Sequence, residues 1–70
     1  MSIFPSLTPK ELIKILERKG FVLKRTHGSH HYYVNPSTRK IAVVPFHNKD
    51  LPKGTLHAIL KQAGIDKDDI

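Results

Sequence analysis

The chain has 70 residues, of which 39% are hydrophobic, and it contains no cysteine. These values predict a single small domain over residues 1–70 with a marginal core, and they exclude a disulfide-stapled scaffold. No apolar run of about 18 residues and no signal-peptide core is present, so we expect a cytoplasmic protein that makes no membrane contact.

The charge is strongly basic and unevenly distributed. Twelve Lys and Arg residues against six Asp and Glu residues give a net charge of +6. Three of the acids lie in residues 66–70, so residues 1–65 carry eleven cations and three anions, a net +8. Such a surface suits a polyanion, nucleic acid first, or an acidic protein partner, and solubility alone is a nearly equal explanation.

The first predicted element is a helix that begins after Thr8. Thr8 is expected to cap it, Pro9 suits the first helical position, and Glu11 completes a capping box. Apolar residues recur at helical spacing as far as Gly20, which predicts a left-handed C-cap. Residues 1–7 before this helix are expected to form a flexible arm.

Three short strands are predicted next. They span residues 21–27, 30–35 and 40–44. Gly28 and Ser29 mark the first turn, and an Asn-Pro-Ser sequence that starts at Asn35 marks the second. Strands joined by such short turns form an antiparallel meander.

A second helix is predicted after a polar loop at residues 46–51. Asp50 or a neighbour is expected to cap it, and Gly64 ends its apolar repeat. The acidic tail at residues 66–70 is expected to fray. The order α-β-β-β-α predicts an α+β fold, in which a three-stranded antiparallel sheet carries both helices on one face and leaves the other face open.

Residues 24–35 hold the densest group of chemically reactive side chains. They include three of the five histidines, two cations and both tyrosines around one Gly-Ser turn. An exposed imidazole can give or accept a proton near physiological pH, which makes His30 a candidate acid or base. Strand alternation directs His30 and Tyr32 to one face and His31 and Tyr33 to the other, and the pattern leaves open which face is buried.

The same segment offers groups that can bind a phosphate or a base. Backbone amides at Gly28 and Ser29 allow close approach, and Lys24 and Arg25 can hold phosphate oxygens. Tyr32 beside them could stack on a base. The simpler alternatives are an ordinary hairpin turn and ordinary solvated charges.

A metal site would have to draw on four histidines: His27, His30, His31 and His47. The chain has no cysteine, and it has no Asp or Glu between Glu17 and Asp50. Alternation also separates His30 from His31. The sequence therefore predicts no metal and no other cofactor.

Several motifs together resemble the HicA family, the small toxins of HicA/HicB type II toxin–antitoxin pairs. The similarity runs from about Thr8 to Ile65. Its motifs are Glu11-Leu12-Ile13, Gly20-Phe21, Gly28-Ser29-His30, Pro45-Phe46-His47, Asp50-Leu51, Gly54-Thr55-Leu56 and the closing stretch Ile59-Leu60-Lys61-Gln62-Ala63-Gly64-Ile65. No motif position departs from the family pattern, and only the short acidic tail differs from longer relatives.

The resemblance implies a fold like that of double-stranded-RNA-binding domains. It also implies a ribosome-independent endoribonuclease, an mRNA interferase, with His30 as the catalytic residue. It further implies that Tyr32 points outward and Tyr33 inward. The implied partners are single-stranded or messenger RNA and a HicB-like antitoxin, which would form a hetero-oligomer with the toxin.

The expected chemistry is a phosphodiester transesterification that needs no metal. His30 would act as base or acid, while Lys24, Arg25 and the turn amides would counter the charge that builds on the phosphate. The second proton carrier stays open among His31, His47 and Ser29. Two other functions also stay open: a non-catalytic RNA-binding module, and an interaction protein for an acidic partner.

Overall fold

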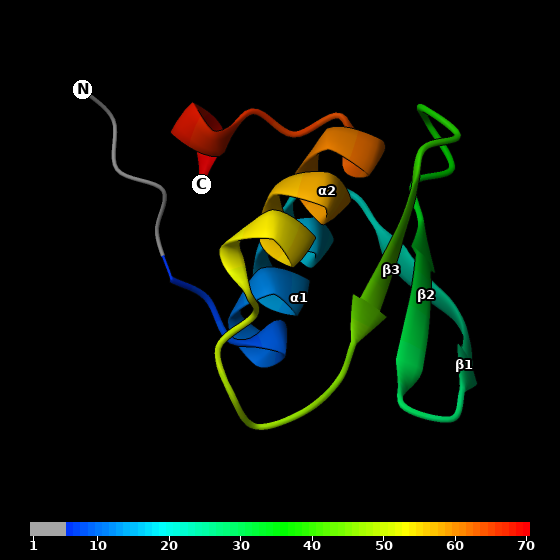
Figure 1. The fold of residues 1–70 in the computed structure, drawn as a ribbon. Coiled ribbons are helices and arrows are strands. Elements are labelled where there is room, and N and C mark those ends of the chain that lie inside the picture. Colours follow the sequence, from blue (N-terminus) through cyan, green and yellow to red (C-terminus); the bar gives the residue numbers. More distant parts are fainter. Residues whose placement is uncertain (1–5) are drawn as a thin grey trace.

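The structure, a computed structural model, describes residues 6–70, apart from the side chain of Lys67, so most of the predicted arm lies outside the described residues. The elements, in chain order, are α1 (Pro9–Arg18), β1 (Val22–His27), β2 (His30–Val34), β3 (Ile41–Pro45), α2 (Lys53–Ala63) and a short 3-10 helix, η1 (Lys67–Asp69) (Figure 1). This order confirms the predicted α-β-β-β-α arrangement.

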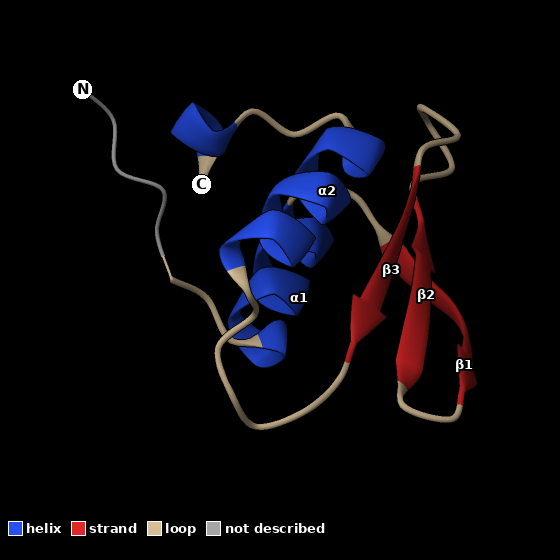
Figure 2. Cartoon of the chain, in the orientation of Figure 1, coloured by secondary structure: helices blue, strands red, loops and turns tan. Residues whose placement is uncertain are grey.

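The three strands form one antiparallel sheet in the order β1-β2-β3, and both α-helices lie on the same side of it (Figure 2). The core between the two layers consists mainly of Leu12, Leu16, Phe21, Tyr33, Ala42, Val44, Leu51, Leu56, Ile59, Leu60 and Ala63. All six residues of β1 are exposed, so this strand extends beyond the cover of the helices. The third strand was expected to end at residue 44, but β3 extends to Pro45, because an edge strand tolerates a missing N–H at its end.

The capping box predicted at the start of α1 is present. The Thr8 hydroxyl accepts a hydrogen bond from the Glu11 backbone N–H at 3.2 Å, and the Glu11 carboxylate accepts one from the Thr8 backbone N–H at 2.9 Å. The carboxylate accepts a second hydrogen bond, from the Thr8 hydroxyl at 3.2 Å. The bond from the Thr8 backbone N–H, and after it the bond from the hydroxyl, lower the pKa of Glu11 below its usual value. The box therefore stabilises the helix at neutral pH, and its contribution is lost as the pH falls through that pKa.

Asn35 joins the end of α1 to the turn between β2 and β3. Its side chain is only 7% exposed. The amide nitrogen donates to the Lys19 carbonyl at 3.0 Å, and the amide oxygen accepts from the backbone N–H groups of Ser37 at 2.9 Å and Thr38 at 3.3 Å. All these groups are thus satisfied by one buried side chain.

The start of α2 differs from the prediction. Pro52 occupies the N-cap position, and no side chain caps the helix, so Asp50 does not have the predicted role. The Pro52 carbonyl accepts the first helical hydrogen bond, from the Leu56 N–H at 2.9 Å. The ring of Pro52 has no oxygen that could bond the remaining N–H groups of the first turn.

Both chain ends contact the body of the protein where the structure describes them. The Leu7 carbonyl accepts a hydrogen bond from the Leu51 N–H at 2.7 Å, and the Leu7 side chain packs against the core. The acidic tail, predicted to fray, instead forms η1, whose N-cap Asp66 accepts from the Asp68 N–H at 3.0 Å. Ile70 also packs against the core, and this apolar contact explains why the tail is ordered.

We predict that Asn35→Ala lowers the free energy of unfolding by about 1–3 kcal/mol, because it leaves the Lys19 carbonyl and two N–H groups without their partner in partly buried bonds. Chemical denaturation measures this loss. Ser37→Ala is the control: it keeps the backbone N–H that Asn35 binds, so its effect should stay within about 0.5 kcal/mol. Equal stability of Asn35→Ala and the unsubstituted protein would show that this bridge contributes nothing.

Candidate functional site

One face of the sheet is free of the helices, and we call it the open face. The cross-strand register assigns it the side chains of Val22, Arg25, His27, His30, Tyr32, Val34, Ile41, Val43 and Pro45. Residues between these, such as Tyr33 at 5% exposure and Val44 at 0%, point to the helices instead. Tyr32 thus faces outward and Tyr33 inward, as the resemblance implies.

His30 is exposed at the start of β2, directly after the turn. Gly28 has φ of +60°, and Ser29 does not share this positive φ, which is the pattern of a type II′ hairpin turn. No heavy atom lies within 4 Å of the position that a Cβ on Gly28 would occupy. The backbone at Gly28 is therefore open to a ligand that approaches the turn.

A β-bulge in β1 places Arg25 on the open face. Leu23 pairs with Tyr33 and Arg25 pairs with Tyr32, so Lys24 is an extra residue in β1. Strict alternation from Leu23 would have sent Arg25 to the helix side. With the bulge, the Arg25 guanidinium carbon lies 4.9 Å from the centre of the Tyr32 ring.

The Arg25–Tyr32 pair is a cation–π contact, which at an exposed site contributes about 0.5–1 kcal/mol. A hollow of about 380 Å³ adjoins it, and its lining consists of Lys24, Arg25, Tyr32, Tyr33, Val34 and Ile41. Two cations, the ring of Tyr32 and two aliphatic side chains therefore meet at one depression, which the buried Tyr33 also borders. That combination suits a nucleotide, which has an anionic backbone and flat bases.

The loop after β3 contacts both His31, on the helix side of the sheet, and the turn at Ser29. The His31 and Phe46 rings stack with centroids 4.5 Å apart and planes 9° from parallel. The Phe46 N–H donates to the Ser29 carbonyl at 2.6 Å. The turn and this loop accordingly lie at the same end of the sheet in Figure 1.

His47 lies in that loop and is exposed. Its Nδ1 atom accepts a hydrogen bond from the Lys49 N–H at 3.2 Å, which leaves Nε2 as the nitrogen that can face a ligand. Two of the candidates for the second proton carrier are thereby placed: His31 faces away from His30, and His47 lies in a separate segment.

His27 was predicted from the sequence only as a ligand of a hypothetical metal site. In the structure it pairs directly with His30 across the two-residue turn, on the open face. Both side chains are exposed. The signal was present in the sequence, because residues on either side of a two-residue hairpin turn form a cross-strand pair.

Tyr33 belongs to the core rather than to the site. Burial raises the pKa of its hydroxyl group, and the nearby Glu17 carboxylate raises it further. The phenol is therefore neutral at physiological pH and does not act as a base there.

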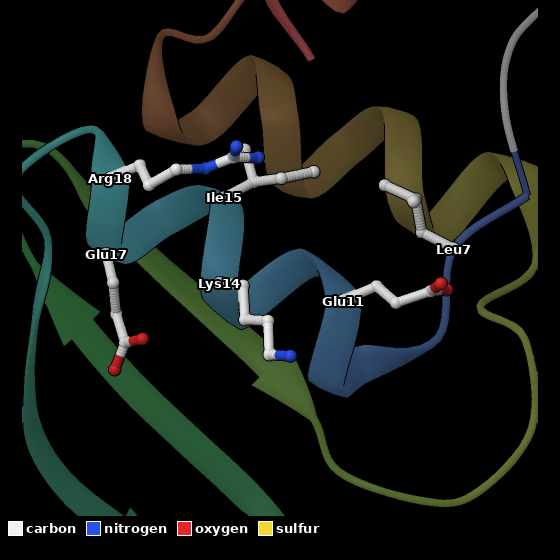
Figure 3. Close-up of a pocket in the computed structure, with 6 residues that line it drawn as sticks. All are labelled: Leu7, Glu11, Lys14, Ile15, Glu17 and Arg18. Carbon is white, nitrogen blue, oxygen red and sulfur yellow. The ribbon is translucent and has the colours of Figure 1, made fainter.

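A second hollow, of about 730 Å³, lies along α1, and its lining residues are labelled in Figure 3. Lys14 and Glu17 point away from α2, whereas Leu7 and Ile15 point toward it. Charges of both signs line this hollow, and Glu11 is already engaged in the capping box. These groups do not converge on one point, so the open face is the better candidate site.

Residues 6–70 include no group of three or more His, Asp or Glu side chains placed to hold a metal ion. Within the same residues, no helix is both long enough and apolar enough to cross a membrane.

Comparison with known families gives a match over most of the chain. Residues 9–65 match the family described as HicA toxin of bacterial toxin–antitoxin. This span covers both α-helices and all three strands. No curated protein matches the chain.

Two glycines should respond in opposite ways to alanine. Gly28→Ala forces a positive φ on a residue with a Cβ and should destabilise the fold by about 1–2 kcal/mol. Gly54 lies in α2, and no heavy atom lies within 4 Å of the position that its Cβ would occupy, so Gly54→Ala should stabilise by about 0.5–1 kcal/mol. Denaturant titration of both variants tests this, and equal signs would contradict the turn geometry.

Proposed function

The chain belongs to the HicA family of toxins from bacterial toxin–antitoxin systems, and from this premise we propose that it is an endoribonuclease that cleaves messenger RNA with His30. The observation that carries the proposal is the exposed imidazole of His30 beside an accessible Gly-Ser turn, on a face that also presents Arg25 over Tyr32. The site of action would be the cytoplasm, where messenger RNA is translated.

The proposed reaction is an attack of a ribose 2′-oxygen on the adjacent phosphorus. His30 would take the proton from the 2′-hydroxyl, or give a proton to the departing 5′-oxygen. Exposure of His30 supports this role, because the imidazole can reach a polymer that lies across the sheet. Side chains of the protein carry all the proton transfer, so the proposed mechanism uses no metal.

Charge on the phosphate would be countered by groups at the bulge and at the turn. Lys24 and Arg25 line the hollow on the open face, and the guanidinium of Arg25 has five donors that suit phosphate oxygens. The backbone amides at Gly28 and Ser29 lie at the exposed turn, where they can approach the phosphate. Tyr32, with Arg25 over one side of its ring, would hold a base by stacking.

A binding module without catalysis is the second candidate function. The observation in its favour is the same basic face, which would bind RNA through charge and stacking whether or not His30 reacts. Incubation of the protein with RNA and EDTA separates the two. Cleavage that persists with the chelator supports the nuclease, and a mobility shift without cleavage supports the binding module.

The antitoxin partner of the system would be a HicB-like protein that covers the open face. This face combines exposed apolar residues, Val22 at 52% and Ile41 at 47%, with the cations Lys24 and Arg25. An acidic protein could bury the two apolar residues and supply carboxylates to the two cations. Such a complex would block phosphate access to His30 and stabilise a small domain by mass action.

We predict that His30→Ala abolishes RNA cleavage and growth arrest and leaves the melting temperature unchanged, because the side chain is exposed. Cleavage assays, a growth assay and a thermal melt measure these three effects. His57→Ala, on the exposed side of α2, is the matched control and should remain toxic. Growth arrest by His30→Ala would refute the assignment of His30 as the catalytic residue. If this variant showed no cooperative thermal unfolding transition, His30 would have a structural role instead.

We also predict that RNA and the antitoxin compete for the open face. Arg25→Ala should weaken RNA binding. It should also make the slope of the logarithm of the binding constant against the logarithm of salt concentration shallower by about one, while Arg18→Ala, on α1, should change neither quantity.

Hydrogen exchange should show protection of residues 28–34 when the antitoxin is added. Protection confined to the helices, with RNA still bound, would require an allosteric inhibition instead.

A further inference from the structure

We propose that His27 is a second catalytic histidine, which carries the proton transfer opposite to that of His30. This inference rests on the proposed nuclease function and deepens it. His27 lies outside the family motif Gly28-Ser29-His30, and the sequence pattern alone did not indicate it for proton transfer.

The geometry of the turn places the two histidines directly opposite each other. His27 ends β1, His30 begins β2, and the two are directly paired across the turn. Directly opposed residues on one face of an antiparallel pair have Cβ atoms about 4.5–5.5 Å apart. Both side chains are exposed, so neither ring is held by the core and both can face one phosphodiester.

The neighbouring pair on the same two strands completes a square of four side chains. Arg25 pairs with Tyr32 just as His27 pairs with His30. Alternate residues of a strand are about 6.6–7 Å apart, which is close to the spacing between successive phosphates of an extended strand. A phosphate between the two imidazoles would therefore leave the next nucleotide over Arg25 and Tyr32.

The other candidates for the second proton transfer are placed less well. His31 points to the helix side of the sheet and is stacked on Phe46. His47 lies in the loop after β3, with Nδ1 bonded to the Lys49 N–H. Ser29 is in the turn, but its hydroxyl does not change protonation near neutral pH as an imidazole does.

The proposed step balances without any further reactant. One neutral imidazole removes the proton of the 2′-hydroxyl as the 2′-oxygen bonds to phosphorus. The other, protonated imidazole gives its proton to the 5′-oxygen as the phosphorus–5′-oxygen bond breaks. The products are a 2′,3′-cyclic phosphate end and a free 5′-hydroxyl end, and exchange with water restores both protonation states.

The surroundings of the pair are cationic rather than acidic. On β1, Arg25 shares the face with His27, and Lys24 lines the hollow beside Arg25. On β2, Tyr32 follows His30, and on β3 the residue opposite His30 is Pro45, which carries no charge. These cations favour binding of the phosphate between the two histidines.

The test is single-turnover cleavage of an RNA oligonucleotide by the full chain, with His27→Gln, His30→Ala and His57→Gln compared over a range of pH. The unsubstituted protein should give a bell-shaped profile, because one imidazole must be neutral and the other protonated. His27→Gln should slow cleavage by roughly 10²–10⁴-fold and remove one limb of the bell. His57→Gln should retain both limbs, and thermal melts should show all variants folded.

A second substrate identifies the acid. A sulfur atom in place of the bridging 5′-oxygen leaves as a thiolate and needs no proton, so it should restore the rate of the variant that lacks the acid and not of the variant that lacks the base. If this substrate restores the cleavage rate of only one of the two histidine variants, the result supports His27 and His30 as an acid–base pair.

The two hypotheses fail in different ways. If the unsubstituted protein cleaves no RNA, the nuclease function is wrong and the inference falls with it. If it cleaves and His30→Ala does not, but His27→Gln keeps the full rate and both limbs, only the inference is overturned. Loss of a limb in His31→Gln or His47→Gln, with His27→Gln unaffected, would overturn it as well.

Discussion

The hydrogen bonds of Asn35 are the constraint on which the relation between the helix layer and the sheet depends. One side chain bonds the carbonyl at the end of α1 and two N–H groups of the β2–β3 turn. Its backbone N–H and carbonyl also close that turn, through Lys40 and Arg39. β2 runs from His30 to Val34 and leads directly into Asn35. The bonds of Asn35 therefore set where this strand lies relative to the helices. The core contacts of Tyr33, two residues before Asn35, then fix which side of β2 faces outward.

The open face owes its chemistry to a combination of regular and irregular structure. Regular pairing of β2 with β3 places His30 and Tyr32 beside the apolar Pro45 and Val43, which supply a flat support with no competing charge. The bulge at Lys24 then adds a guanidinium to a position that an uninterrupted strand would have turned toward the helices. A sheet face with cations at its border suits a flexible polymer, because a surface that is already ordered loses little entropy when the polymer binds.

The order of elements was predictable because each has a local signal, whereas the details that build the site depend on contacts across the sheet. The capping box of Thr8 and Glu11 predicts the start of α1, and the glycine at position 28 predicts the turn of the hairpin. The bulge at Lys24 has no such signal, because cations fit an exposed strand in either register. The ordered tail depends on a distant contact, the packing of Ile70 on the core, which outweighs a sequence that is locally polar. At the start of α2, Pro52 occupies the N-cap position that the sequence favoured for Asp50 or a neighbour.

The exposed position of β1 has a consequence for self-association. An unpaired strand at the border of a sheet is a template on which a second copy can add, and repeated addition leads to aggregates. In β1, the extra residue Lys24 interrupts the spacing of the backbone groups that a second strand would need, and Arg25 beside it carries a charge that another copy would repel. The feature that shapes the ligand surface therefore also disfavours the addition of a second copy along the β1 edge.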